Sequence, residues 1–422
     1  MAVAIAPTTT PARQRSLARG VVVAQLGARM DYAVPRILES SGMLQRLYTD
    51  GVYPRSLRRI PNMMQPKLLQ RLMRREPRGV DPGRVTSFPV FGVRYAWRQR
   101  RVQQHQRVSV YLWAGREFCR KAIHAGIGNS EMVYAFNSAA LELMDFARKN
   151  GSLCVLEQTI APKRIERVIL EEESARWPGW EEGPGSSRAL DIEYGDREAE
   201  EWSKSDLIVC GSEFVAQSIS AAGGPKERCV VIPYGVDPVS AEYVERSPRR
   251  DLHVLFVGRI GLRKGAPYVA ECARALKSRT FQFRAAGPSD LPPKALSEFA
   301  SHVEVMGPVS PLEVANLYGW ADVLILPTLC EGSATVCYEA LAAGIPVITT
   351  PNAGSIVRDG IDGFIVPIRR ADLLAEKLEM LAQDGDLLRS LSRNAAKRAL
   401  DHTLSRYGER LLAALTNLAA SI

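Results

Sequence analysis

Short apolar runs alternate with segments of helical spacing along most of the chain. Residues 21–26 form the first run, which Gly27 closes and a helical pattern over residues 32–41 follows. Residues 132–136 and 153–156 form further runs, each beside a helical pattern. Strands that alternate with helices in this way form a parallel sheet with helices on both faces. The sequence therefore predicts an α/β fold of the doubly wound kind.

A second series of apolar runs begins near Asp206. Its eight β-like runs are residues 207–210, 229–233, 253–257, 282–286, 303–306, 323–326, 347–349 and 363–366. Residues 247–250 (Ser-Pro-Arg-Arg) interrupt the series and are interpreted as an interdomain linker. Since 422 residues are enough for two domains, we predict two doubly wound domains with the ligand site in the crevice between them.

The pattern divides the chain into four parts. These are a flexible tail at 1–19, a first domain at 20–205, a second domain at 206–400 and a terminal segment at 401–422. Within the terminal segment, apolar residues recur at helical spacing over residues 406–419, which predicts a last helix.

Composition excludes several classes of protein. The apolar fraction is 46% and the charged fraction 24%, as in soluble globular proteins. No apolar run reaches the roughly 18 residues of a spanning helix, and the start lacks the apolar core of a secretory signal, so we expect a cytoplasmic protein. The seven cysteines include no C-x-x-C pair and the five histidines no cluster, so neither a disulfide framework nor a metal site is predicted.

Basic residues concentrate in the first half. The chain has 55 Lys and Arg against 46 Asp and Glu, a net charge of +9 that favours anionic partners. Residues 55–101 contain 13 basic and two acidic residues, an excess of +11. Within them, residues 63–75 have the pattern of a basic amphipathic helix, which either lies on an anionic membrane or packs on the first domain. Nucleic-acid binding is disfavoured, because no aromatic stacking pattern or recognition helix accompanies the charge.

A small-residue loop and a helix start follow the run at 323–326. Glu331 precedes this helix start, and the first N–H groups belong to Ala334, Thr335 and Val336. A helix N-terminus offers unpaired N–H donors and a positive dipole end, so we expect a phosphate to bind these three groups. Glu331 would then face whatever the phosphate carries.

Glu339 lies eight residues after Glu331, which is roughly 12 Å along a helix. At that distance the two carboxylates are not an acid/base pair, but they can bind separate parts of one long ligand. A nucleotide-sugar fits, with Glu331 accepting hydrogen bonds from sugar hydroxyls and Glu339 from the ribose diol. Alternatively, Glu331 only stabilises a helix start and Glu339 is a solvated helix residue.

A glycine-rich turn follows the run at 253–257. Its glycines let the backbone approach a ligand, while Arg259 and Lys264 can clamp a diphosphate and neutralise the charge that develops as it leaves. The alternative is a glycine turn with solvated cations. The spacing is not that of a P-loop, so a P-loop nucleotide hydrolase is not predicted.

Taken in order, these motifs resemble the retaining GT-B glycosyltransferases of family 4. The resemblance rests on Gly258-Arg259 with Lys264-Gly265, Pro327, Glu331-Gly332, the run from Glu339 to Val347, and Gly360 with Gly363, and it covers roughly residue 207 to the end. It implies two Rossmann-like domains facing each other across a cleft, with a nucleotide-diphosphate sugar held mainly by the second domain and no cofactor or metal. By position, Arg259 and Lys264 bind the diphosphate. Glu331 binds the donor sugar and Glu339 the ribose, and the last helix crosses back to the first domain.

The first half resembles the family only loosely. Gly27 occupies the turn where the family's glycine loop approaches the diphosphate and acceptor. Where the family often has a histidine, after the strand at 153–156, this chain has Gln158, and Asn137 follows the strand at 132–136. Amides can hydrogen-bond a sugar hydroxyl but do not titrate near neutral pH, so no histidine base is expected. Asn137 is alternatively a helix N-cap.

The resemblance implies a retaining glycosyltransferase that moves a sugar from a nucleotide-diphosphate donor, a UDP-sugar on family grounds. The implied acceptor is a glycan, oligosaccharide or lipid-linked molecule in surface polysaccharide biosynthesis, attacked from the front face with the leaving phosphate taking its proton. A lipid-linked acceptor fits a cytoplasmic enzyme that docks peripherally on the inner membrane face. The alternatives are a GT-B phosphorylase or epimerase, and a non-catalytic protein that binds nucleotide-sugars or nucleic acid.

Overall fold

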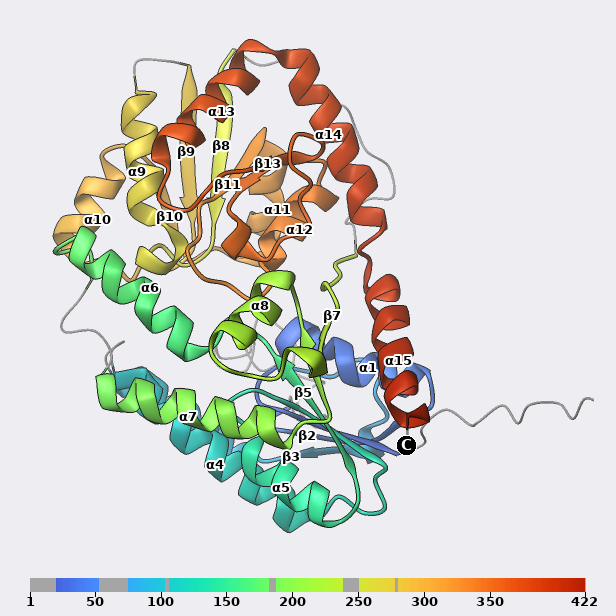
Figure 1. The fold of residues 1–422 in the computed structure, drawn as a ribbon. Coiled ribbons are helices and arrows are strands. Elements are labelled where there is room, and N and C mark those ends of the chain that lie inside the picture. The colour runs from blue at the N-terminus through green and yellow to red at the C-terminus, as the bar shows by residue number, and fades with distance from the viewer. Residues whose placement is uncertain are drawn as a thin grey trace, which may run out of the picture.

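The computed structural model describes residues 20–52, 75–102, 106–181, 187–237, 250–277 and 280–421. The predicted tail at 1–19, most of the amphipathic segment at 63–75 and most of the linker at 247–250 lie outside the described residues. Within the described part, helices surround two separate parallel sheets (Figure 1). The prediction of two doubly wound α/β domains is confirmed.

The first sheet has seven strands in the order β3-β2-β1-β4-β5-β6-β7, and all neighbours are parallel. The strands are β1 (Val21–Gln25), β2 (Leu44–Thr49), β3 (Val85–Ser87), β4 (Met132–Phe136), β5 (Leu153–Gln158), β6 (Leu207–Cys210) and β7 (Cys229–Val231). The helices of this domain are α1 (Ala33–Ser40), α3 (Pro89–Arg101), α4 (Arg107–Ala125), α5 (Leu141–Lys149), α6 (Lys163–Arg176), α7 (Arg188–Lys204) and α8 (Glu213–Ala221).

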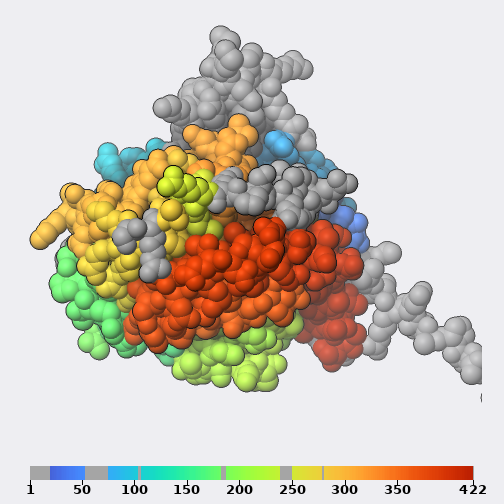
Figure 2. Space-filling model, turned by 90° about the horizontal axis from the view of Figure 1, so that it is seen from above, coloured from blue at the N-terminus to red at the C-terminus, as the bar shows by residue number. Residues whose placement is uncertain are grey.

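The second sheet has six parallel strands in the order β10-β9-β8-β11-β12-β13. They are β8 (Leu252–Val257), β9 (Phe281–Ala286), β10 (Glu304–Gly307), β11 (Val323–Leu326), β12 (Val347–Thr349) and β13 (Gly363–Ile365). The helices are α9 (Ala266–Ala275), α10 (Pro293–Ala300), α11 (Pro311–Trp320), α12 (Thr335–Ala342), α13 (Ala371–Gln383), α14 (Gly385–Leu400) and α15 (Leu404–Ala420). Figure 2 shows α13 and α14, in red, extending across the second domain.

The predicted boundary at 205/206 is wrong. Strand β6 pairs with β5, with Ile208 opposite Leu156, and β7 pairs with β6, so both strands extend the first sheet. The second sheet begins only at β8. The apolar pattern identified both strands correctly, but it carries no information about which sheet a strand joins.

Both faces of the first sheet are covered, which explains why its central strands are continuously apolar. Val21 and Val23 of β1 enter one core, while Val22 and Ala24 enter the core on the opposite face. Side chains of a strand alternate between faces, so a strand buried on both sides needs apolar residues at every position. All five residues of β1 are buried.

Two of the contacts between the domains are made by helices. Helix α15 crosses to the first domain, where Gly408 lies against Ile37 of α1 and the ring of Tyr407 meets that of Tyr234 edge-on at 5.9 Å (Figure 1). At the other contact, the hydroxyl of Tyr268 on α9 donates to Glu173 of α6 at 2.6 Å. In the part of the chain that the structure describes, no helix is both long and apolar enough to span a membrane.

Candidate active site

Each sheet reverses its strand order between two neighbouring central strands. These are β1 and β4 in the first sheet and β8 and β11 in the second. Ligands of open α/β sheets bind beyond the carboxyl ends of strands at such switch points. The loops that follow β8 and β11 carry Arg259, Lys264 and Glu331, the three predicted catalytic residues.

These two loops are held together by backbone contacts. Gly265 has φ +75°, and a Cβ there would lie 2.1 Å from the carbonyl oxygen of Pro327, so only glycine fits this close approach. The carbonyl of Arg263 accepts hydrogen bonds from the N–H of Leu329 at 2.9 Å and from the hydroxyl of Thr328 at 3.0 Å. The predicted Lys264-Gly265 and Pro327 motifs therefore form one unit.

Glu331 is paired with two cations from the β8 loop. Its Oε1 lies 2.7 Å from Nζ of Lys264 and 2.6 Å from Nη1 of Arg263. Burial alone would raise the pKa of Glu331, but the charges of Lys264 and Arg263 outweigh it and hold that pKa below its ordinary value. The carboxylate is therefore charged at neutral pH. Sequence reasoning missed Arg263, although it adjoins Lys264.

A cavity of about 550 Å³ lies between the two domains at this point. Its charged lining includes Arg259, Arg263 and Lys264 from the second domain and Lys163, Glu166 and Glu198 from the first. The structure thus brings the predicted Arg259 and Lys264 to one cavity. Arg259 is the more exposed of the two, at 42% of its side chain, and it pairs with Asp290 at 2.7 Å rather than with Glu331.

The start of α12 offers fewer phosphate donors than predicted. The N–H of Ala334 already donates to the carbonyl of Ala353 at 3.1 Å. Thr335 and Val336 occupy the first turn, where N–H groups have no acceptor within a helix. Of the three N–H groups predicted to bind a phosphate, those of Thr335 and Val336 therefore remain candidates.

Glu339 lies on α12, and its carboxylate is bonded to a different element from that of Glu331. The hydroxyl of Tyr318 on α11 donates to Oε2 of Glu339 at 2.8 Å. The side chain is half-buried. The two predicted acids therefore act in separate surroundings, Glu331 among cations and Glu339 beside a tyrosine.

Gly27 forms the turn after β1, with φ +85°. Its N–H donates to Oδ1 of Asp50 at 2.9 Å. Three consecutive left-handed residues, Met30 to Tyr32, then lead the chain into α1. Such conformations are unfavourable for residues other than glycine and are typical of functional turns.

This turn presents Arg29, which was not among the residues predicted for the site. The residue is exposed, and its guanidinium donates to the hydroxyl of Tyr234 at 3.2 Å. Its charge is near enough to help lower the pKa of Glu331. The first domain therefore adds a cation to the electrostatic field of the second domain's site.

Asn137 and Gln158, predicted to contact the donor sugar, are used inside the first domain instead. Oδ1 of Asn137 accepts from the N–H and hydroxyl of Thr159, at 3.1 and 2.8 Å. The amide of Gln158 is fully buried, donates to Glu198 at 2.9 Å and accepts from the indole of Trp202 at 2.9 Å. Both amides are bonded to groups of the first domain and do not face the cavity as free donors. This corrects the prediction that they contact the donor sugar. Asn137 is not the N-cap of α5 either, since Ala140 is.

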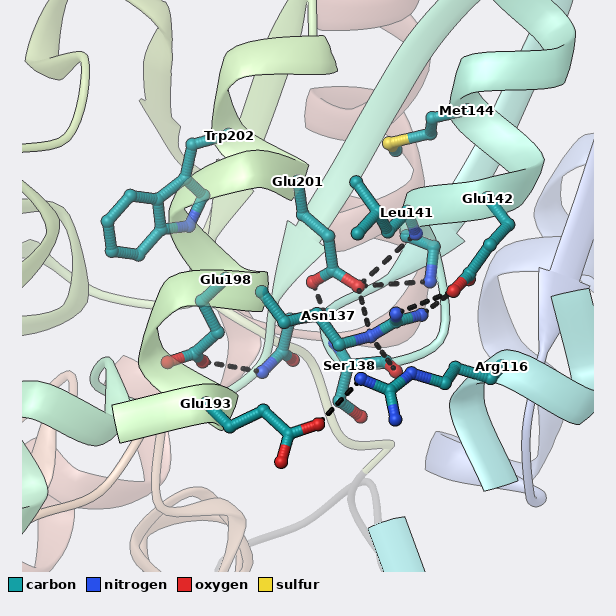
Figure 3. A network of polar contacts seen from close by, with 12 residues as sticks. Arg116, Asn137, Ser138, Leu141, Glu142, Met144, Glu193, Glu198, Glu201 and Trp202 are labelled. Carbon is teal, nitrogen blue, oxygen red and sulfur yellow. Dashed lines mark hydrogen bonds and ion pairs between the residues drawn. The ribbon is translucent and has the colours of Figure 1, made fainter. Parts of the chain in front are cut away.

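Two glutamates of α7 hold this region together (Figure 3). Glu201 accepts from the N–H groups of Ser138, Ala140 and Leu141, at 2.8, 3.2 and 3.3 Å, and so caps the start of α5. Glu198 accepts from Asn137 at 3.2 Å and from the N–H of Lys163 at 2.7 Å. The sequence pattern contained no signal for either role, because the partners are 35 to 63 residues away.

Glu198 also lines the cavity between the domains. Burial raises its pKa to about 7, so its carboxyl group titrates near neutral pH. Nearby, Nζ of Lys163 pairs with Glu166 at 3.0 Å, and Glu166 lies 3.9 Å from Nε of Arg263. A chain of charges thus connects the first domain to the cations that surround Glu331. Within the ranges given above, no three His, Cys, Asp or Glu side chains could together hold a metal ion.

Most of the second domain is similar to a known protein family. Residues 251–384 match the family described as glycosyl transferases group 1. The WcaL protein of Salmonella typhimurium, named for colanic acid biosynthesis, is 28% identical over 249 residues, which are 54% of this chain and 61% of that protein. A D-inositol 3-phosphate glycosyltransferase of Arthrobacter is 32% identical over 165 residues, 36% of this chain and 39% of that protein. The chain covers less than two thirds of the length of either relative.

Similarity to solved structures shows the fold of both domains. Anabaena HepE in complex with UDP superposes with a TM-score of 0.61 at 13% identity and covers 94% of this chain and 100% of its own. Sucrose-phosphate synthase from Thermosynechococcus elongatus superposes with a TM-score of 0.64 at 16% identity, covering 96% and 100%. The fold is GT-B, as the motifs implied. Residues 251–384, which match the glycosyl transferases group 1 family, lie in the second domain of this fold.

Proposed function

We propose that the chain is a retaining, metal-independent glycosyltransferase that uses a UDP-sugar and a glycan, oligosaccharide or lipid-linked acceptor in surface polysaccharide biosynthesis. The observation that carries the proposal is the charged Glu331 between Lys264 and Arg263, at the switch point of the second sheet. The group 1 match supports sugar transfer, the UDP bound to HepE supports the donor, and the name of WcaL supports the polysaccharide.

In this proposal the donor diphosphate takes over cations that Glu331 now holds. A diphosphate has more negative charge than one carboxylate, so it competes well for Lys264 and Arg263. Glu331 then accepts hydrogen bonds from the hydroxyls of the donor sugar. Arg259, which is more exposed, leaves Asp290 and completes the clamp.

Transfer then proceeds on one face of the donor sugar. The acceptor hydroxyl attacks the anomeric carbon from the side on which the diphosphate leaves. The bond between the anomeric carbon and the diphosphate oxygen breaks, and the leaving phosphate takes the proton of the acceptor hydroxyl. Lys264 and Arg259 stabilise the negative charge that grows on the diphosphate. The N–H groups of Thr335 and Val336 add the positive end of α12.

The test combines ligand stabilisation with turnover. UDP-sugars are expected to raise the melting temperature of the full chain, because a ligand that binds only the folded state stabilises it. A radiolabelled UDP-sugar should then be slowly hydrolysed, and the released sugar should have the anomeric configuration of the donor. Stabilisation without any turnover would instead identify a binding protein, and turnover that requires orthophosphate would identify a phosphorylase.

A further inference from the structure

Helix α3 exposes a stripe of large apolar side chains. Val90, Val93 and Trp97 are 74%, 68% and 52% exposed. Their spacing of three and four residues places them on one face of the helix. The opposite face packs on α4 through Phe91, which is 2% exposed and whose ring lies 5.7 Å from that of Trp113. The stripe is therefore an outer surface of a folded helix and not a part of the core.

Helix α3 is also strongly basic, although the guanidinium groups of Arg94 and Arg98 lie toward α4, at 5.8 and 4.2 Å from the centroid of the Trp113 ring. Helix α3 contains four arginines and no acidic residue. Arg94, Arg100 and Arg101 are exposed, and the guanidinium of Arg101 lies over the ring of Trp97 at 4.0 Å from its centroid. An apolar stripe with a tryptophan, flanked by arginines, matches the boundary of an anionic bilayer, where apolar atoms enter the lipid and cations meet the headgroups.

The position of α3 connects this surface to the candidate active site. A Cβ on Gly92 of α3 would lie 2.4 Å from the carbonyl oxygen of Asp50, the residue whose carboxylate binds the N–H of Gly27. Helix α4, on which α3 packs, contributes Arg107, Val108 and Tyr111 to the lining of the cavity between the domains. The surface and the cavity thus belong to one helix pair.

We propose that α3 is a docking surface for an anionic lipid bilayer, with Val90, Val93 and Trp97 entering the interface and Arg94, Arg100 and Arg101 binding headgroup phosphates. The consequence for the acceptor, which rests on the proposed function, is that docking brings the cavity close to the membrane and favours a lipid-linked acceptor. Other occupants fit less well. A second copy of α3 would place arginines against arginines, and a nucleic acid would have no use for the two exposed valines.

The test measures binding of the full chain to vesicles of phosphatidylcholine with and without phosphatidylglycerol. We expect binding only to the anionic vesicles, weakening as salt rises. Arg94→Gln and Arg101→Gln should each weaken it about fivefold. The double variant Val90→Asn, Val93→Asn should weaken it about tenfold or more. Melting curves identify any variant that fails to fold.

Matched controls lie on the second domain. Leu312→Asn alters a side chain on α11 that is 74% exposed, as Val90 is, and Lys397→Gln removes an exposed cation on α14. Both should leave vesicle binding unchanged. The proposal is overturned if the wild type ignores anionic vesicles, if the α3 variants bind like the wild type, or if the controls lose as much. Hydrolysis of a soluble UDP-sugar is measured separately: its absence beside intact vesicle binding would overturn the proposed function and leave the docking surface standing.

Discussion

The two domains use the polar residues at their strand ends differently. In the second domain, Lys264 and Glu331 follow β8 and β11, and their charged ends meet at 2.7 Å beside the cavity. In the first domain, Asn137 and Gln158 stand at the ends of β4 and β5, yet their amides are bonded to Glu198 and buried. A polar residue that follows a strand in the sequence can therefore be placed at the carboxyl edge of the sheet. Its availability to a ligand depends on which neighbour has already bonded it.

The largest expected effect, and the strongest test of this difference between the domains, comes from removing the charge of Glu331. Glu331→Gln should lower turnover about 100-fold, the loss typical of removing one group that stabilises a transition state. Affinity for UDP should stay nearly intact, because UDP lacks the donor sugar that Glu331 is proposed to bind. Titration calorimetry with UDP and turnover of the UDP-sugar give the two numbers.

Glu339→Gln is the matched control for that variant. It removes the same charge eight residues away, where the partner is Tyr318 and not a cation. We expect weaker UDP binding with less effect on turnover at saturating donor, because the proposed ligand is the ribose. Equal losses of UDP affinity in both variants would contradict the division of roles.

A smaller effect is expected when the cation beside Glu331 is removed. Lys264→Ala should weaken UDP about 10- to 100-fold, since charge-assisted hydrogen bonds are worth roughly 1.5–3 kcal/mol. Arg259→Ala should act in the same direction. Arg284→Ala, which removes an arginine paired with Glu304 elsewhere in this domain, serves as the control and should bind UDP normally. If all three variants bind UDP alike, the cavity is not the diphosphate site.

The first domain should respond in stability and not in ligand binding. Gln158→Ala leaves the indole of Trp202 and the carboxyl of Glu198 without a buried partner, so the free energy of unfolding should fall by about 2 kcal/mol. Urea unfolding measures this loss, and UDP affinity measured under native conditions should not change. A loss of UDP affinity at unchanged stability would restore Gln158 as a ligand residue.

Much of the fold could be predicted from the sequence because local patterns of apolar residues determine where strands and helices form. Continuous apolar runs marked strands buried on both faces, as in β1, β4 and β11. Strand β2 escaped prediction because Gln45 and Arg46 interrupt its apolar side chains. The error at the 205/206 boundary has another cause, since pairing partners are set by contacts between distant segments.

Site residues could be predicted from the sequence where the backbone geometry permits only one residue type. Gly265 must be glycine because Pro327 approaches it, and this requirement leaves a visible motif. No sequence motif marks Arg29, Glu198 or Glu201. Their roles depend on groups of other elements, such as the hydroxyl of Tyr234 and the amides at the start of α5.

The free energy of unfolding should also depend on pH, with opposite signs in the two domains. Burial raises the pKa of Glu198 to about 7, so between about pH 4.5 and about pH 7 the folded state holds a proton that the unfolded state has lost. The free energy of unfolding should therefore fall as pH rises through this window, by at most about 1.4 kcal/mol per pH unit. Glu201, whose pKa is also raised to about 7, contributes in the same direction.

Glu331 supplies the contrast. Its pKa is lowered by Lys264 and Arg263, so its contribution is present above its ordinary pKa of 4.5 and is lost as pH falls through the lower folded value. In urea titrations repeated across pH, Glu198→Gln should flatten the decline toward neutral pH and leave the acid limb unchanged, whereas Glu331→Gln should flatten only the acid limb. Identical pH profiles for the two variants would mean that the two carboxylates share one environment, which their contacts in the two domains do not allow.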